Sequence, residues 1–232
     1  VGREHELDVL RTVFDRSVES RECHVATVMG VAGVGKSRLT GELVATTGER
    51  ATIVGGRCLP YGEGITFWPI TELLQGAAGV SDSDPPSEVR RKLDLLLEDA
   101  PDSALVGDRL GGFLGLDSAT PGVHGTFWSV RKLLETLAER RPLLVVFDDI
   151  QWAEPTFLDL LEYLADWIRG VPVMLLFLAR PELVETRGSW LSAKANHSLL
   201  SLPPLTDAET DGLISNLLGG GQLADDARAR IA

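Results

Sequence analysis

Residues 30–37 read Gly-Val-Ala-Gly-Val-Gly-Lys-Ser, which matches the pattern G-x-x-x-x-G-K-[ST] between a strand-like run and a helix-like segment. Glycines let a backbone fold tightly around a phosphate chain, so that successive N–H groups point at negative oxygens. The Lys36 ammonium would lie near the terminal phosphates, and the Ser37 hydroxyl is a hard oxygen ligand for Mg²⁺. The alternative is a glycine-rich turn that binds nothing. The expected contacts of the phosphate-binding loop are Gly30, Ala32, Gly33, Val34, Gly35, Lys36, Ser37 and Arg38.

A pair of carboxylates forms the second chemical group. Asp148 and Asp149 follow a continuous apolar run at residues 143–147, which is typical of a strand buried on both faces. Ligands of open α/β sheets bind at the carboxyl ends of strands, although adjacent acids there also serve as turn formers. We expect Asp148 to hold a hydrated Mg²⁺ and Asp149 to orient and polarise an attacking water. Mg²⁺ and Lys36 are the expected counter-charges of the pair.

A single arginine, Arg180, directly follows another apolar run at residues 173–179. This position suits a residue that senses a γ-phosphate, and it equally suits a surface salt-bridge partner. Trp152 is expected to be a packing anchor for the helix that follows it rather than a ligand contact. Three further arginines are weak candidates for a finger inserted into a neighbouring subunit and are more typical of solvated surface charges: Arg140, Arg141 and Arg187.

The elements that must position these residues alternate along the chain. Strands are predicted at residues 24–29, 51–55, 143–147, 173–179 and 198–202, and helices between and around them. This alternation predicts an α/β fold of the P-loop NTPase type, with a mainly parallel five-stranded sheet flanked by helices. Because a strand candidate and a long stretch separate Lys36 from Asp148, we expect an extra strand between the first strand and the acidic one.

Residues 1–232 are interpreted as one P-loop ATPase domain. Two parts of it do not follow the alternation of strands and helices. Residues 57–124 are predicted to form a helical insertion between the second and third strands, with helices at 70–78 and 87–100 and a flexible joint at 79–86. Residues 206–232 are expected to begin a C-terminal helical region that this chain cuts short, with a capping box at its start.

Composition narrows the function classes. The net charge of −12 disfavours direct binding of nucleic acid by this segment. The longest apolar run, residues 171–179, is too short to cross a bilayer, and we expect no membrane contact. Two cysteines, Cys23 and Cys58, lack the spacing of a zinc site or a disulfide framework. Buried thiols in a reducing, cytoplasmic setting are the expectation.

These segments together resemble the STAND branch of the AAA+ superfamily, the signal-transduction ATPases with numerous domains. Within that branch the chain is similar to bacterial modules fused to class III adenylate cyclases or to large LuxR-type transcriptional regulators. The similar segments are VGRE at 1–4, the loop at 30–39, RCLPYGEG at 57–64, FWP at 67–69, DDIQWA at 148–153, ARP at 179–181 and LPPL at 202–205. The resemblance implies ATP or ADP with Mg²⁺ as ligands, Val1, Gly2 and Arg3 as contacts of the base, and Arg180 as the γ-phosphate sensor.

The resemblance also implies a function. It indicates a regulatory ATPase that hydrolyses ATP slowly and switches attached C-terminal helical or output domains between ATP and ADP states, with nucleotide-dependent self-association as a further expectation. A small-molecule kinase is one alternative, since it would share residues 30–37, but it does not need Asp149 and its lid is usually rich in arginine. A nucleotide-binding scaffold without catalysis is the other. Release of phosphate without an acceptor separates the ATPase from both.

Overall fold

The computed structural model describes residues 2–61, 66–116, 122–186, 194–206 and 210. Within them, five strands form one sheet in the order β2-β3-β4-β1-β5, and every described strand pair is parallel. The predicted fold class is confirmed. The strands are β1 (Cys23–Met29), β2 (Thr52–Arg57), β3 (Leu143–Asp148), β4 (Val173–Ala179) and β5 (His197–Ser201).

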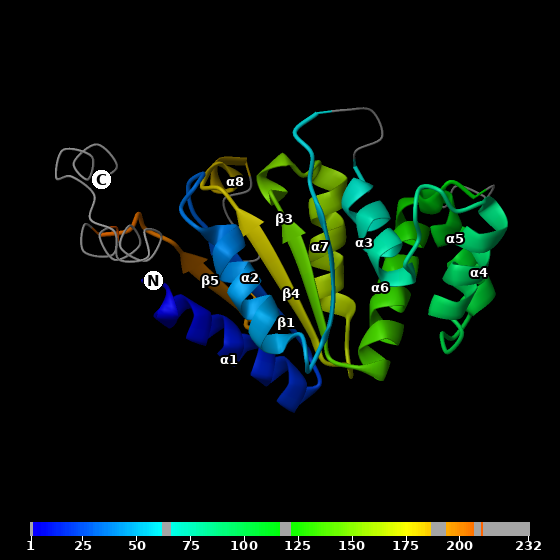
Figure 1. Ribbon diagram of the computed structural model, residues 1–232, viewed down its shortest axis with the longest axis horizontal. Coiled ribbons are helices and arrows are strands. Elements are labelled where there is room, and N and C mark those ends of the chain that lie inside the picture. The colour runs from blue at the N-terminus through cyan, green and yellow to red at the C-terminus, as the bar shows by residue number, and fades with distance from the viewer. Residues whose placement is uncertain (1, 62–65, 117–121, 187–193, 207–209, 211–232) are drawn as a thin grey trace, which may run out of the picture.

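Strand β4 lies between β1, which leads into the glycine-rich loop, and β3, which ends in the acidic pair. The register aligns Met29 with Ala179 and Phe147 with Phe177, so the carboxyl ends of these strands share one edge (Figure 1). The expected extra strand between the two motifs is therefore present. On the far side of β3, Arg57 at the end of β2 is in register with Asp148.

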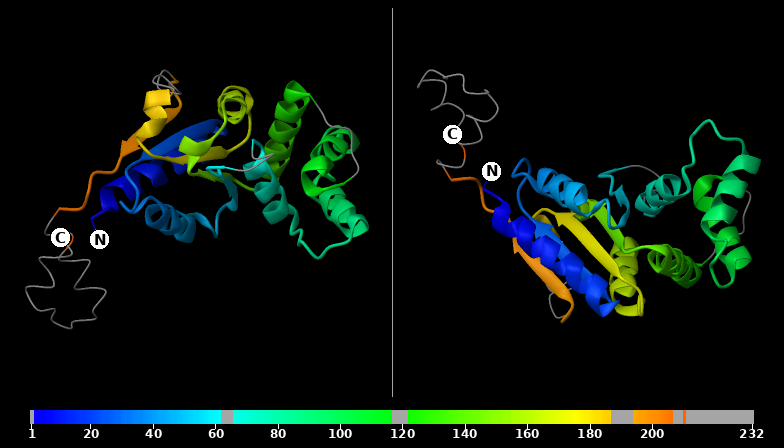
Figure 2. Two further views of the ribbon diagram at one scale, coloured as in Figure 1. Left: turned by 90° about the horizontal axis from the view of Figure 1, so that it is seen from above. Right: turned by 60° about the horizontal axis from the view of Figure 1, so that its bottom comes forward.

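Helices cover both faces of the sheet because their apolar residues recur at helical spacing. Helices α1 (Glu4–Ser20) and α2 (Lys36–Thr47) lie on one face, and α6 (Val123–Arg140) and α7 (Pro155–Trp167) lie on the other (Figure 2). Every residue of β4 is buried, which explains its unbroken apolar sequence. Buried side chains facing the sheet from the helices include Leu10, Phe14, Leu39, Leu43, Val130, Leu134, Leu161 and Leu164.

The insertion between β2 and β3 is helical, as predicted. It contains α3 (Trp68–Ala78), α4 (Pro86–Leu96), α5 (Ser103–Gly111) and the short turn η1 (Gly112–Leu114), and it extends past edge strand β2, away from β5 (Figure 1). Its first helix packs directly on that strand. A Cβ atom on Gly56 would lie 2.1 Å from the carbonyl oxygen of Pro69, so this close approach requires glycine.

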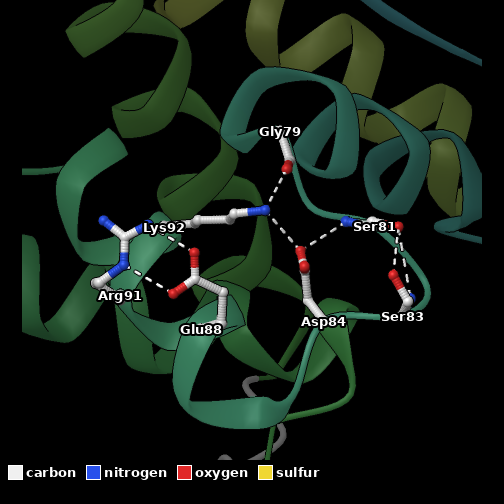
Figure 3. Close-up of polar contacts among 7 residues, drawn as sticks. All are labelled: Gly79, Ser81, Ser83, Asp84, Glu88, Arg91 and Lys92. Carbon is white, nitrogen blue, oxygen red and sulfur yellow. Dashed lines mark hydrogen bonds and ion pairs between the residues drawn. The ribbon is translucent and has the colours of Figure 1, made fainter.

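The connection between α3 and α4 is held by polar contacts, whereas the sequence suggested a flexible joint at residues 79–86. The Lys92 ammonium donates to the carbonyl oxygen of Gly79 and to the carboxylate of Asp84, both at 2.7 Å (Figure 3). The backbone N–H of Ser81 donates to the same Asp84 oxygen at 2.8 Å. One lysine therefore ties the end of α3 to the start of α4.

The two cysteines match their expectation. Cys23 and Cys58 are both free and buried, as predicted, and burial raises the pKa of each thiol to about 12.

The chain beyond β5 lies almost wholly outside the described residues, so the helical region expected at 206–232 stays a prediction. Helix α8 (Glu182–Thr186) follows β4. No described helix has both the length and the apolarity needed to cross a bilayer.

Candidate active site

The loop between β1 and α2 has the backbone that its glycines predict. Gly33 and Gly35 adopt φ angles of +80° and +103°, which side chains of L-residues disfavour. Helix α2 begins immediately after them, at Lys36. Because the first N–H groups of any helix have no intrahelical partner, this arrangement directs donors at the space in front of the loop.

A hollow of about 310 Å³ lies in front of this loop, at the carboxyl edge of the sheet. It brings together the five side chains to which the sequence assigned chemistry, although they come from separate segments of the chain. Arg57, which the sequence analysis did not single out as a site residue, joins them. The lining residues are Ala32, Gly33, Gly35, Lys36, Ser37, Arg38, Arg57, Asp148, Asp149 and Arg180.

A second hollow, of about 390 Å³, lies on the other side of the loop. Arg3 lines it, as expected of a base contact, whereas Gly2 is not among its lining residues and Val1 lies outside the described residues. Two expected contacts of the phosphate-binding loop, Gly30 and Ala32, do not line this second hollow. Ala32 lines the first hollow, whereas Gly30 is buried at the base of the loop. The lining residues are Arg3, Glu4, Leu7, Gly33, Val34, Gly35, Arg38, Leu39, Glu42 and Leu205, so the two hollows share Gly33, Gly35 and Arg38.

Arg3 also connects distant parts of the chain. Its guanidinium forms an ion pair with Glu6 at 3.1 Å and donates to the carbonyl oxygen of Pro203 at 2.5 Å. The segment before α1 is thereby joined to the segment after β5. Both segments border the second hollow, since Leu205 lines it together with Arg3.

Lys36 is buried and is used by the loop itself. Its ammonium donates to the carbonyl oxygens of Gly30 at 2.6 Å and Val31 at 3.1 Å. Burial, and then the charge of Arg180, lower the pKa of Lys36, while the nearby carboxylates oppose that shift. The lysine is therefore a buried cation with both an arginine and carboxylates nearby.

The side chain that pairs with Asp149 is Arg57 rather than Lys36. Nε of Arg57 donates to Oδ2 of Asp149 at 2.8 Å, and its Nη2 contacts the same oxygen. Asp149 is only 8% exposed and has a φ of +54°, a conformation in which a non-glycine residue is strained. Burial alone would raise the pKa of Asp149, but hydrogen bonds from Gln151 and Arg57 and the arginine charges outweigh it and lower that pKa.

Asp148 has the opposite electrostatic environment. Burial is the main reason that its pKa is raised, although its Oδ1 accepts a hydrogen bond from the backbone N–H of Asp149 at 2.7 Å. Its neighbour thus has an arginine partner, while Asp148 is left short of positive charge. Two adjacent carboxylates with opposite shifts are suited to different roles.

The turn after the acidic pair, η2 (Ile150–Trp152), contacts Arg180 in two ways. The side-chain oxygen of Gln151 accepts the backbone N–H of Arg180 at 3.1 Å. The ring of Trp152 lies beside the Arg180 guanidinium, 5.8 Å from centroid to Cζ. Trp152 is 44% exposed, so the expectation of a packing anchor is wrong. Nε of Arg180 is buried and makes no hydrogen bond within the described residues.

Comparison with known proteins fits this geometry. A family profile described as "AAA ATPase domain" matches residues 1–176, which is well over half of the chain. The chain belongs to the AAA ATPase domain family. The resemblance to AAA+ ATPases is thereby confirmed.

Individual relatives are distant. A Rhizobium meliloti (strain 1021) protein described as uncharacterized is 29% identical over 219 residues, which is 90% of this chain and 21% of that protein. This chain thus spans about a fifth of its relative. A structure of Drosophila ORC bound to poly(dA/dT) DNA and Cdc6 has a TM-score of 0.50 and 12% identity, covering 93% of this chain and 31% of that one. A STAND protein with a tetratricopeptide repeat sensor from Pyrococcus horikoshii has a TM-score of 0.49 and 16% identity, covering 100% and 27%. Such likeness concerns the fold alone.

Proposed function

We propose that this AAA ATPase domain binds ATP with Mg²⁺, hydrolyses it slowly, and uses the ATP and ADP states to switch attached C-terminal helical or output domains, as in STAND proteins. One observation carries the proposal: Lys36, Ser37, Asp148, Asp149 and Arg180 gather around one hollow at the carboxyl edge of the sheet. A phosphate chain in this hollow would meet the start of α2. The base would then occupy the second hollow, beside Arg3.

The residues at the edge of the first hollow fit a magnesium ion. Ser37 and Asp148 both line it and supply hard oxygen atoms, and Mg²⁺ is usually held by one or two protein oxygens together with phosphates and water. Burial, and then the charge of Asp149, raise the pKa of Asp148, and a cation beside the carboxylate would favour its ionised form. When bound, the ion would offset the negative charge of the phosphates.

Hydrolysis would require Asp149 to orient a water in line with the γ-phosphorus. The water oxygen would form the new bond to phosphorus while its proton passes to the Asp149 carboxylate, the bond to the bridging oxygen would break, and ADP and phosphate would be the products. Lys36 and Arg180 would stabilise the charge on the transferred group. Oδ2 of Asp149 accepts both bonds from Arg57, and Oδ1 accepts one from Gln151, so a water would have only the remaining lone pair of Oδ1 unless the Arg57 pair opens. This restriction supports slow turnover.

Thermal melts with and without Mg·ATP test the binding half of the proposal. We expect ATP to raise the melting temperature of the wild type and to raise that of Lys36→Ala much less, since Lys36 supplies the charge for the phosphates. Lys132→Ala is the matched control, because Lys132 pairs with Glu135 on α6. Equal shifts in the wild type and Lys36→Ala would show that the loop does not bind ATP.

A scaffold without catalysis is a second candidate, favoured by the two occupied oxygens of Asp149. Phosphate release measured with no acceptor distinguishes the candidates: the ATPase releases phosphate, whereas a scaffold or a small-molecule kinase does not. Self-association and a cytoplasmic location belong to the same proposal. We also propose that this segment does not bind nucleic acid, because of its charge of −12; the DNA in the similar ORC structure is bound by ORC.

A further inference from the structure

A continuous series of hydrogen bonds links the phosphate-binding loop to Asp149. The backbone N–H of Gly30 donates to the carbonyl oxygen of Ala179 at 3.1 Å. The peptide group that contains this carbonyl also contains the N–H of Arg180, which donates to Oε1 of Gln151 at 3.1 Å. Nε2 of Gln151 then donates to Oδ1 of Asp149 at 2.8 Å. Bonds arranged in series polarise one another, so a change at one end alters the bonds along the rest.

Gln151 supplies the one side chain that stands between the backbone of the loop and the Asp149 carboxylate in this series, and its chemistry suits the place. A carboxamide has an acceptor at one end and donors at the other, and the Arg180 N–H requires the acceptor. The amide group must therefore turn its nitrogen toward Asp149. Glutamate in this position would place a second negative charge against Asp149 and lose the donor, and methionine would lose both bonds while keeping a similar length.

The turn η2 holds Arg180 by its side chain as well as by its backbone. Gln151 accepts the backbone N–H of Arg180, and the neighbouring Trp152 ring lies beside its guanidinium. Arg180 itself lines the hollow in front of the loop. A change in the position of Arg180 therefore reaches Asp149 through one short segment, which begins immediately after Asp149.

We propose that Gln151 is a positioning residue that couples the nucleotide state detected at Arg180 to the orientation of the Asp149 carboxylate. When Arg180 engages a γ-phosphate, the peptide group between Ala179 and Arg180 moves, and the carboxamide transmits this movement to Oδ1 of Asp149. Gln151 itself contacts no phosphate. This inference rests on the proposed ATPase function for its catalytic consequence, whereas the coupling within the protein can be measured separately.

Kinetics of Gln151→Met test the catalytic consequence. We expect kcat to fall about tenfold or more, as for loss of a hydrogen bond to a charged group, and the Kd of ATP to stay within about twofold. Gln151→Glu should lower kcat at least as much. Gln75→Met, in a half-buried position on α3, is the matched control and should keep the wild-type rate. A folded Gln151→Met variant with wild-type kcat would overturn the inference.

Hydrogen exchange at the Arg180 amide provides a readout that needs no hydrolysis. In the wild type we expect this amide to be protected, and its protection to differ between ADP and a non-hydrolysable ATP analogue. Gln151→Met should speed its exchange and remove that difference, while the Gly30 amide, bonded to Ala179, stays protected. Unchanged exchange at Arg180 would overturn the inference. A wild type that shows the exchange difference but releases no phosphate would instead contradict the proposed function alone.

Discussion

The guanidinium of Arg57 and the carboxylate of Asp149 form an ion pair between the end of β2 and the residue that follows β3. Arg57 is largely exposed, whereas the carboxylate is nearly buried, so the pair closes one side of the phosphate hollow. The backbone N–H of Arg57 donates to Glu72 on α3 at 2.6 Å. The insertion and the acidic residue therefore share one arginine.

Arg57→Ala is expected to raise the basal rate of phosphate release several-fold at saturating ATP. The substitution frees Oδ2 of Asp149 for the attacking water, while the hydrogen bond from Gln151 still holds Oδ1 in place. Arg57→Lys, which keeps the charge, should lie between the alanine variant and the wild type. A rate below that of the wild type in Arg57→Ala would mean that the pair holds Asp149 in its productive orientation.

Asp148→Asn and Asp149→Asn should differ in nucleotide binding. Asp148→Asn is expected to weaken Mg²⁺-dependent binding of ATP, because the carboxylate short of counter-charge is the one proposed to hold the cation. Asp149→Asn should bind ATP normally and lose phosphate release. Calorimetric titration with and without Mg²⁺ measures the first effect and a phosphate assay the second. Equal loss of binding in both variants would refute this division of roles.

Arg180→Ala should reduce the ratio of ATP affinity to ADP affinity more than it changes ADP affinity. Its guanidinium borders the hollow and its buried Nε makes no hydrogen bond within the described residues, so a phosphate oxygen is a suitable acceptor. Trp152→Ala should reduce the same ratio to a smaller degree, since the ring only supports the guanidinium. Titrations with both nucleotides decide this, and a ratio unchanged in Arg180→Ala would leave the arginine without a nucleotide role.

The two buried thiols predict a loss of stability in alkali. Their folded-state pKa of about 12 lies above the value of 9.0 for an unburied thiol, so their contribution is complete below pH 9 and falls as pH rises toward 12. At pH 10 each thiol should cost about 1.4 kcal/mol of unfolding free energy. Urea unfolding at pH 8 and pH 10 measures the fall, which should be smaller in Cys23→Ala/Cys58→Ala. An identical fall in that variant would assign it to other groups.

The strands and the phosphate loop could be predicted from the sequence because their signals are local. The run at residues 173–179 is apolar throughout and coincides with β4. The position of Arg57 beside Asp149 could not be read in this way, because it depends on β2 being the neighbour of β3. The sequence does carry one signal: Arg57 lies two residues after the strand predicted at 51–55, as Asp148 and Arg180 lie just after theirs, and strand ends of a parallel sheet meet at one edge.

Two features of the insertion could not be predicted from the periodicity of its apolar residues, each for a different reason. Helix α5 is short, and two of its nine residues are glycines, which weaken a helical pattern. The contacts of Lys92 with Gly79 and Asp84 join positions on both sides of a turn whose Gly, Ser, Asp and Pro residues resemble a loose linker. Composition indicates where a chain turns, but not which side chain holds the turn. The link made by Gln151 was hidden for the same reason, since one of its two partners, the Arg180 amide, lies in a distant segment.

The sheet order also governs when this domain can fold during synthesis. Strand β1 is made early, but its neighbours are β4 and β5: Cys23 pairs with Val173, and Val25 with His197. An apolar strand therefore waits for partners that leave the ribosome much later, and such distant pairings form slowly. Until those partners are made, the edges of β1 have no strand to pair with, and unpaired strand edges favour aggregation. Fragments that end before β4 should aggregate for that reason.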